Sequence, residues 1–166
     1  MFQLLLFLHI GAAIVAFGPT FTFPLIGARG GREPQHGNFA LRLNELIVTR
    51  MVLPFAATMP ITGLGIVNVA GIDFFHAAWL DLAIVLYAAA VTLSVGVLLP
   101  NTRRLIELTT MPPAAAGGPA APPAGDGRPA GPPPEFFARV RRSQLGGLLS
   151  GILIVAILAL MVIRPG

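Results

Sequence analysis

The chain has 166 residues, of which 55% are hydrophobic and only 11% are charged, and its mean hydropathy is +0.79. Soluble domains carry about a quarter charged residues, so this composition excludes an ordinary soluble domain and indicates an integral membrane protein. The net charge of +4 comes from arginines, which membrane topology and lipid headgroups explain more simply than nucleic acid, and the lack of cysteine excludes disulfides and thiolate sites.

Four segments are long and apolar enough to cross a bilayer, whose hydrocarbon core of about 30 Å needs about 20 helical residues. They run over residues 2–26, 46–70, 77–99 and 145–163. The first segment has no basic residue before it and is longer than the apolar region of a signal peptide, so we predict a retained span. The sequence thus predicts an all-α bundle of four transmembrane helices, with residues 1–166 forming one domain.

The arginines predict the orientation of the bundle through the positive-inside rule. The first connection and its flanks carry Arg29, Arg32, Arg42 and Arg50. The third connection and its flanks carry Arg103, Arg104, Arg128, Arg139, Arg141 and Arg142. The short second connection has none, and the C-terminal tail has only Arg164. We therefore predict that both termini lie outside and both arginine-rich connections lie in the cytoplasm, as in a multi-pass protein of the bacterial inner membrane.

The second helix is predicted to begin before the membrane, with Asn38 as its cap and with an ion pair between Arg42 and Glu45. Prolines inside the spans predict kinks, because proline removes a helix hydrogen bond. In the second span, Thr58 and Thr62 are expected to bond the carbonyls that the prolines leave free.

Residues 111–134 form a tract of Pro, Gly and Ala that is predicted to be a disordered or polyproline-like cytoplasmic loop. Its flanks, residues 101–108 and 135–142, mix arginines with apolar residues and predict short interfacial helices on anionic lipid. The arginines expected to contact lipid headgroups are Arg103, Arg104, Arg139, Arg141 and Arg142.

Two ionisable residues inside the spans are the candidates for chemistry, since such residues are costly unless paired or hydrated. His9 and Asp81 fall at a similar depth, roughly 7 and 10 Å toward the outside of their helix centres by helical rise. We expect them to lie close together inside the bundle. Three interpretations stay open: a structural hydrogen bond between helices, a haem- or metal-binding site, and a proton relay for transport.

Strips of small residues predict helix packing, within the bundle, in self-association or against another membrane protein. One strip on the first span includes Ala12 and Ala16, and one on the fourth includes Ser143, Gly147 and Gly151. Phosphate loops, zinc-protease pairs and nucleophile elbows are absent from the sequence. The leading hypothesis is thus a small non-enzymatic membrane protein, either free-standing or an accessory subunit of a larger membrane complex.

Four short motifs resemble a family of predicted bacterial four-helix integral membrane proteins whose function is unknown. They are the opening Leu-Leu-Phe-Leu-His9-Ile-Gly-Ala, the arginine-rich first loop, Met59-Pro-Ile-Thr-Gly63 and Leu99-Pro-Asn-Thr-Arg-Arg-Leu. The early histidine is also distantly similar to that of copper-resistance D proteins and of the J-type membrane protoporphyrinogen oxidase. This second resemblance implies a metal or porphyrin connection for His9. Those relatives carry further histidine or lysine positions that this chain does not match.

Overall fold

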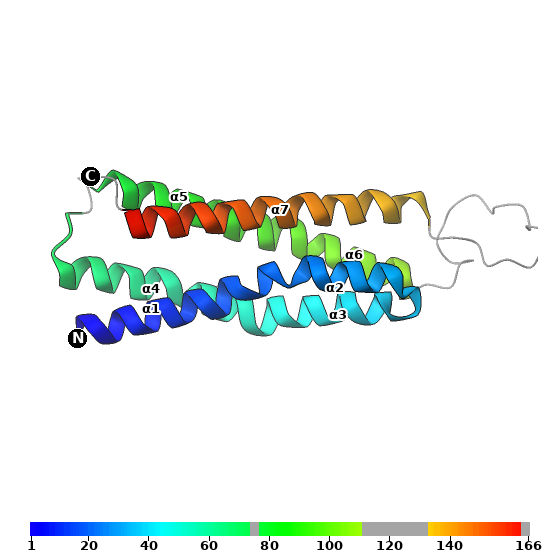
Figure 1. Ribbon diagram of the computed structural model, residues 1–166, viewed down its shortest axis with the longest axis horizontal. Coiled ribbons are helices and arrows are strands. Elements are labelled where there is room, and N and C mark those ends of the chain that lie inside the picture. The colour runs from blue at the N-terminus through cyan, green and yellow to red at the C-terminus, as the bar shows by residue number, and fades with distance from the viewer. Residues whose placement is uncertain (74–76, 111–132, 164–166) are drawn as a thin grey trace, which may run out of the picture.

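The computed structural model describes residues 1–73, 77–110 and 133–163, and it shows four long helical runs (Figure 1). The first run consists of α1 (Phe2–Phe17), the 3₁₀ turn η1 (Gly18–Phe21) and α2 (Phe23–Arg32). After the short turn η2 (Pro34–His36), the second run consists of α3 (Gly37–Ile47), the π turn η3 (Val48–Val52) and α4 (Leu53–Ala70). The third consists of α5 (Ala78–Leu93), the π turn η5 (Ser94–Leu98) and α6 (Leu99–Thr110), and the fourth is α7 (Pro134–Ile163).

All four runs are long and apolar enough to cross a membrane, which confirms the four predicted spans. They contain 31, 34, 33 and 30 residues, or about 45–50 Å of helix at a rise of about 1.5 Å per residue. Since the hydrocarbon core is about 30 Å thick, each run has about 15–20 Å to spare. The predicted loop is tested only at its end: residues 111–132 lie outside the described residues, and Pro134 already begins α7.

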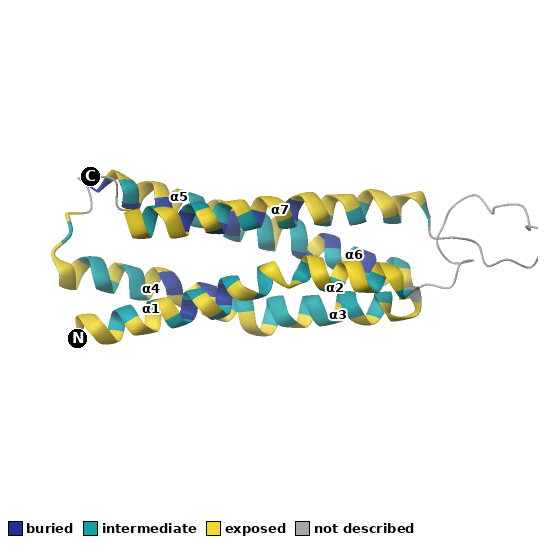
Figure 2. Cartoon of the chain, viewed as in Figure 1, coloured by how far each residue is buried: buried dark blue, intermediate teal, exposed yellow. Residues whose placement is uncertain are grey.

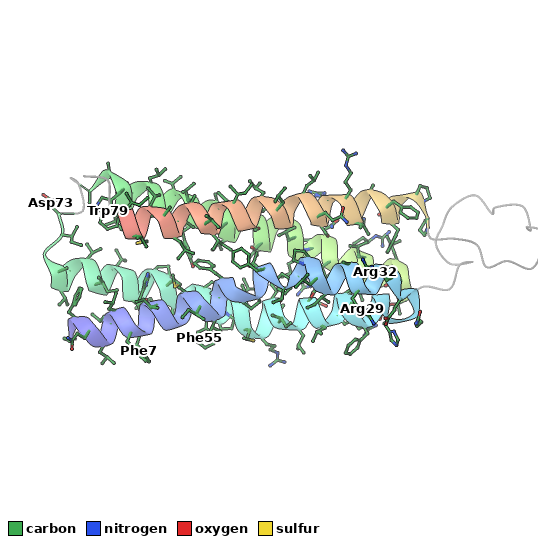
Figure 3. The ribbon with its side chains drawn as sticks, in the orientation of Figure 1. Phe7, Arg29, Arg32, Phe55, Asp73 and Trp79 are labelled. Carbon is green, nitrogen blue, oxygen red and sulfur yellow. The ribbon has the colours of Figure 1, made fainter. Side chains whose placement is uncertain are left out.

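The two ends of the bundle are built from different elements (Figure 1). We call one of them the arginine-rich end, because α2, α3, α6 and the start of α7 lie there, and we call the opposite end the termini end, because α1 begins and α7 finishes there. Arg29 and Arg32 lie at the arginine-rich end, far from Asp73 and Trp79 at the termini end (Figure 3). The predicted interfacial helices are therefore wrong: residues 101–108 and 135–142 belong to α6 and α7, which continue the membrane helices.

The helices associate in pairs toward the termini end, where α1 lies beside α4 and α5 lies beside α7 (Figure 1). At the arginine-rich end, α3 contacts α2 and α6, and α6 contacts α7. Only 11% of the most apolar stretch of each of the first three runs, and 22% of that of α7, is buried within the protein. Figure 2 shows that exposed residues dominate the outward faces, as expected for helices whose solvent is lipid.

Three helix irregularities lie at one level of the bundle, which we call the irregular layer: η1, η3 and η5. Counted from the helix ends at the termini end, they lie about 24–33 Å along their runs. This distance is close to the thickness of a hydrocarbon core, about 30 Å. The irregular layer thus separates a membrane-spanning half of the bundle from the helical extension at the arginine-rich end.

Proline explains the two π turns of this layer. Each turn directly precedes a leucine–proline pair, Leu53-Pro54 or Leu99-Pro100, and each leucine N–H bonds the carbonyl five residues back. A proline ring crowds the carbonyl four residues before it and supplies no N–H. The wider i→i+5 turn gives the ring room and lets the run continue as a helix. Pro19 lies in the 3₁₀ turn of the same layer.

The turn after α4 is closed by Gly71, whose φ of 64° is left-handed. Its N–H bonds the carbonyl of Asn68, and the N–H of Ile72 bonds the carbonyl of Val67. This pattern is the Schellman motif, in which a glycine ends a helix because it has no Cβ to clash.

Candidate functional site

His9 lies between α1 and α4. Its Nδ1 is 2.9 Å from the Oγ1 of Thr62. A Cβ on Gly63 would lie 3.3 Å from the Cε1 of His9, so the glycine leaves room for the imidazole ring. The histidine of the first span therefore packs onto the Thr62-Gly63 step of α4 and links the two helices.

The hydroxyl oxygen of Thr62 lies within hydrogen-bond distance of three groups: Nδ1 of His9 at 2.9 Å, the carbonyl of Thr58 at 3.0 Å and the carbonyl of Met59 at 3.2 Å. If the hydroxyl donates to its own helix, a neutral His9 donates its Nδ1–H to the oxygen and carries the lone pair on Nε2. The opposite tautomer, in which Nδ1 accepts from the hydroxyl, fits the same distance.

Asp81 does not join this contact. It lies on α5, which pairs with α7, and its side chain is exposed. Among the described residues, the hydrogen bonds and ion pairs of the structure do not connect it to His9, so the expected His9–Asp81 contact is not formed. Helical rise predicted that the two residues lie at a common depth. They are separated because α1 packs on α4, whereas α5 packs on α7.

Tyr87 provides a link between the two helix pairs that the sequence analysis missed. Its hydroxyl on α5 donates to the carbonyl of Ala56 on α4 at 2.6 Å. Pro60 lies four residues after Ala56 and has no N–H, so this carbonyl lacks its helical donor. The signals available were a lone tyrosine inside one span and an interior proline in another.

The threonines of α4 do not bond this freed carbonyl, contrary to expectation. Thr58 donates to the carbonyl of Phe55, and Thr62 donates within its own preceding turn. A hydroxyl on a helix reaches carbonyls three or four residues back, so Thr58 and Thr62 bond different carbonyls. The donor for Ala56 comes from α5 instead.

Asn101 is the centre of a buried polar network at the arginine-rich end. Its side chain is 2% exposed, and its Nδ2 donates to the carbonyl of Arg139 at 2.9 Å and to Ser143 Oγ at 2.8 Å. Its Oδ1 accepts from Arg139 Nη1 at 3.3 Å. Asn101 thereby fixes α6 against α7 with both ends of its amide. The polar residue directly after Pro100 was the only sequence signal for this role.

Carboxylates extend this network along the surface. Glu135 accepts from Arg139 at 2.8 Å and lies 3.5 Å from Arg104, which also donates to Glu107 at 2.9 Å. The hydrogen bond from Arg139 and the charge of Arg104 hold the pKa of Glu135 below its ordinary value of 4.5. The hydrogen bond to Glu107, followed by the charge of Glu135, raises the pKa of Arg104.

A second polar cluster joins α3 to α6. Asn38 donates to the carbonyl of Ile106 and to the hydroxyls of Thr109 and Thr110, at 2.8–3.3 Å. The predicted cap is therefore wrong, because Asn38 lies inside α3 and its amide crosses to α6. The cap position is held by His36, without a side-chain bond.

The predicted pair of Arg42 and Glu45 is also replaced by other partners. Arg42 Nε donates to Asn38 Oδ1 at 2.8 Å, and Glu45 accepts from Arg103 on α6 at 2.7 Å. Arg42 therefore bonds one turn back along α3, whereas Glu45 pairs across to α6.

The predicted packing residues occupy different environments. Ala12 and Ala16 are 6% and 0% exposed on α1. On α7, the closest approach occurs at Gly146, where a Cβ would lie 2.5 Å from Leu98 Cδ2, while Gly147 has open space beside it. Ser143 bonds Asn101, and Gly151 lies near Phe21. A role for Gly147 in contacting a partner stays a prediction.

The predicted headgroup arginines fall into two groups. Arg103, Arg104 and Arg139 are engaged with carboxylates of the protein. Arg141 and Arg142 are exposed and make no ion pair with any described residue. Within residues 1–73, 77–110 and 133–163, no cluster of three or more His, Cys, Asp or Glu side chains is positioned to hold a metal ion.

Comparison with known proteins adds one match. Residues 3–165 match the family described as "Predicted integral membrane protein (DUF2269)". No curated protein and no solved structure matches the chain.

Proposed function

Since the chain belongs to the DUF2269 family of predicted integral membrane proteins, we propose that it is a non-enzymatic multi-pass protein that serves as an accessory subunit of a membrane complex. The observation that carries this proposal is the use of its polar side chains within the spans. His9 bonds Thr62, and Tyr87 bonds the carbonyl of Ala56, so each one links two helices of the bundle. These groups act as interhelical hydrogen bonds that stabilise a membrane bundle.

The exposed surface supports a role in assembly. Large apolar residues such as Phe7 and Phe55 lie on the outer side of the α1/α4 pair, 73% and 41% exposed (Figure 3). The arginine-rich end projects about 15–20 Å past the thickness of a hydrocarbon core. A partner embedded in the bilayer would meet the apolar faces, and a peripheral partner would meet the extension.

The proposed orientation places the arginine-rich end in the cytoplasm of a bacterium and both termini outside. It rests on the positive-inside rule and on the arginines at that end, among them Arg29, Arg32 and Arg103. Cysteines introduced singly at Gly31 and at Asp73 would test it with a membrane-impermeant thiol reagent on intact cells, since the chain has no cysteine of its own. Labelling at position 73 alone supports this orientation, and labelling at position 31 alone reverses it.

The assembly proposal is tested by the mass of the particle extracted from its native membrane with a mild polymer. A single chain has a mass of 17.4 kDa. We expect a larger particle that contains a second polypeptide in fixed ratio, and the same particle from a His9→Ala variant at reduced thermal stability. A chain that is monomeric and free of other polypeptides directly after extraction would overturn the accessory role.

A haem or metal ligand is a second candidate, favoured by the orientation of His9. A ring whose Nδ1–H is held by a neighbour presents Nε2 to a metal, and histidine ligands in proteins are usually oriented in this way. Thr62, whose Oγ1 lies 2.9 Å from Nδ1, would be that neighbour here. Asp81 lies in the other helix pair and gives this candidate no second ligand.

Absorption spectra of the oxidised and dithionite-reduced protein, with metal analysis of the same sample, test this candidate. A Soret band or stoichiometric metal that disappears in His9→Ala and weakens in Thr62→Val would establish it. A colourless, metal-free protein from native membranes would leave His9 as a residue that links helices.

A further inference from the structure

A groove opens on the surface between η5 and α7, at the irregular layer. Its volume is about 350 Å³, at the lower end of the range of about 300–1,000 Å³ that is typical of ligand sites. Its apolar lining includes Val97 of η5 and Leu145, Gly146 and Leu149 of α7. Arg141 and Arg142 line one end.

The groove has an apolar end and a charged end, and their order along α7 matches a bilayer. Counted from Ile163, Leu149 lies about 21 Å and Leu145 about 27 Å along the helix, within a hydrocarbon core of about 30 Å. Arg141 and Arg142 lie about 32–33 Å along it. The apolar walls thus fall at the level of acyl chains, and the guanidinium groups fall at the level of lipid phosphates.

The charge of these two arginines is not compensated by the protein. Arg29, Arg103, Arg104 and Arg139 each have a carboxylate partner. Arg141 and Arg142 have none among the described residues, and both are exposed. Guanidinium groups bind phosphate oxygens through paired hydrogen bonds. Two adjacent uncompensated arginines therefore favour a ligand with negative charge.

We propose that this groove binds one anionic diacyl phospholipid, with an acyl chain along Val97, Leu145 and Leu149 and the phosphate on Arg141 and Arg142. The site discriminates by net charge, because a zwitterionic lipid brings its own cation to the two guanidinium groups. The packing of Leu98 on Gly146 shapes the groove, since a side chain at position 146 would push against Leu98. The proposed accessory role does not depend on this site.

The test is native mass spectrometry of the purified full chain after delipidation, with phosphatidylglycerol or phosphatidylcholine of the same acyl chains added back. We expect wild-type protein to retain one phosphatidylglycerol in preference to phosphatidylcholine. Arg141→Ala/Arg142→Ala should lower that retention about 10- to 30-fold, from the usual contribution of two basic residues near an anionic surface. Val97→Phe keeps both charges but narrows the groove, and it should lower retention as well.

The matched control removes the same charge elsewhere. Arg32 and Arg50 are exposed arginines away from the groove, and Arg50 lies in the irregular layer. Arg32→Ala/Arg50→Ala should retain the lipid as the wild type does. Equal losses in both double variants, or retention unaffected by Val97→Phe, would overturn the site in favour of general surface attraction. Displacement of the lipid by soluble glycerophosphate at equal concentration would overturn the acyl-chain contact.

Discussion

The two halves of the bundle are stabilised by different kinds of contact. At the arginine-rich end, Asn101, Asn38 and Glu45 each send a polar side chain to a neighbouring helix. On the termini side of the irregular layer, the polar links between helices include His9 to Thr62 and Tyr87 to Ala56, and most of the apolar surface stays exposed.

The difference follows from the solvent of each half. In lipid there is no hydrophobic driving force that brings apolar surfaces together, so helices associate there through close packing and a few hydrogen bonds. Helices that project into water carry more polar side chains, and those of α3, α6 and α7 pair with one another. One sequence thus builds its bundle by two sets of rules, with the irregular layer as the boundary. Four predictions test this division.

The largest effect is expected at the polar network of the arginine-rich end. Asn101→Leu would leave the Ser143 hydroxyl and an Arg139 N–H without their buried partner, and the Arg139 carbonyl would keep only its helical donor. Each unsatisfied buried group costs about 1–3 kcal/mol, so we expect a loss of about 3 kcal/mol in the free energy of unfolding, measured by denaturant titration in micelles. Thr102→Ala, which removes only a bond to the carbonyl of Leu98 in the same helical run, should change it little. Equal effects of the two changes would contradict a central role for Asn101.

A smaller effect is expected where α7 approaches η5. Gly146→Val would drive a side chain into Leu98, and overpacking of this kind costs about 1–3 kcal/mol. Gly147→Ala meets open space and should be neutral or slightly stabilising, because alanine favours helix. Thermal unfolding of both variants in the same detergent measures the contrast. Combining Gly146→Val with Leu98→Ala should recover part of the loss; no recovery would place the strain elsewhere.

The hydrogen bond between the helix pairs should be worth less. Tyr87→Phe leaves the carbonyl of Ala56 without a donor, at a cost of about 0.6–1.7 kcal/mol as for other bonds within membranes. Pro60→Ala restores the backbone N–H that this carbonyl lacks. In the Pro60→Ala background, therefore, Tyr87→Phe should cost almost nothing. A double-mutant cycle of unfolding free energies measures this coupling. Additive effects would show that the Tyr87 hydroxyl does not replace the N–H that Pro60 lacks.

The smallest effect concerns pH. The pKa of Glu135 is lowered in the folded protein, first by the hydrogen bond from Arg139. Its stabilising contribution is therefore complete above its ordinary pKa of 4.5 and is lost as pH falls through the folded value. Hydrogen exchange at the start of α7 should accelerate below that range. Glu135→Gln should remove the acceleration, whereas Glu107→Gln, which breaks a pair within α6 alone, should preserve it.

The sequence predicted the number and positions of the spans, because a bilayer imposes a length of apolar residues that composition reveals directly. It did not predict that residues 101–108 and 135–142 continue those helices. The third predicted span ended at residue 99, directly before Pro100, and no repeat of apolar residues marks the π turn that accommodates this proline.

The sequence predicted the depth of the candidate residues along the bundle, but it did not predict which residues they contact. Depth follows from residue number along a helix, so His9 and Asp81 were placed at one level. Which helices become neighbours depends on close contacts such as His9 on Gly63, which form only between distant segments. Tyr87 and Asn101 were missed for the same reason, since their acceptors include backbone carbonyls, which residue types do not reveal.

The two π turns have a consequence for the phase of the helices. Each one inserts an extra residue into a turn, which rotates everything beyond it by about 100° relative to a regular helix. Deleting one residue from η3 or η5 would leave the run helical and nearly as long, yet would turn the side chains of one half to new neighbours. The extra residue therefore sets the rotation about the helix axis of the water-facing half relative to the membrane half.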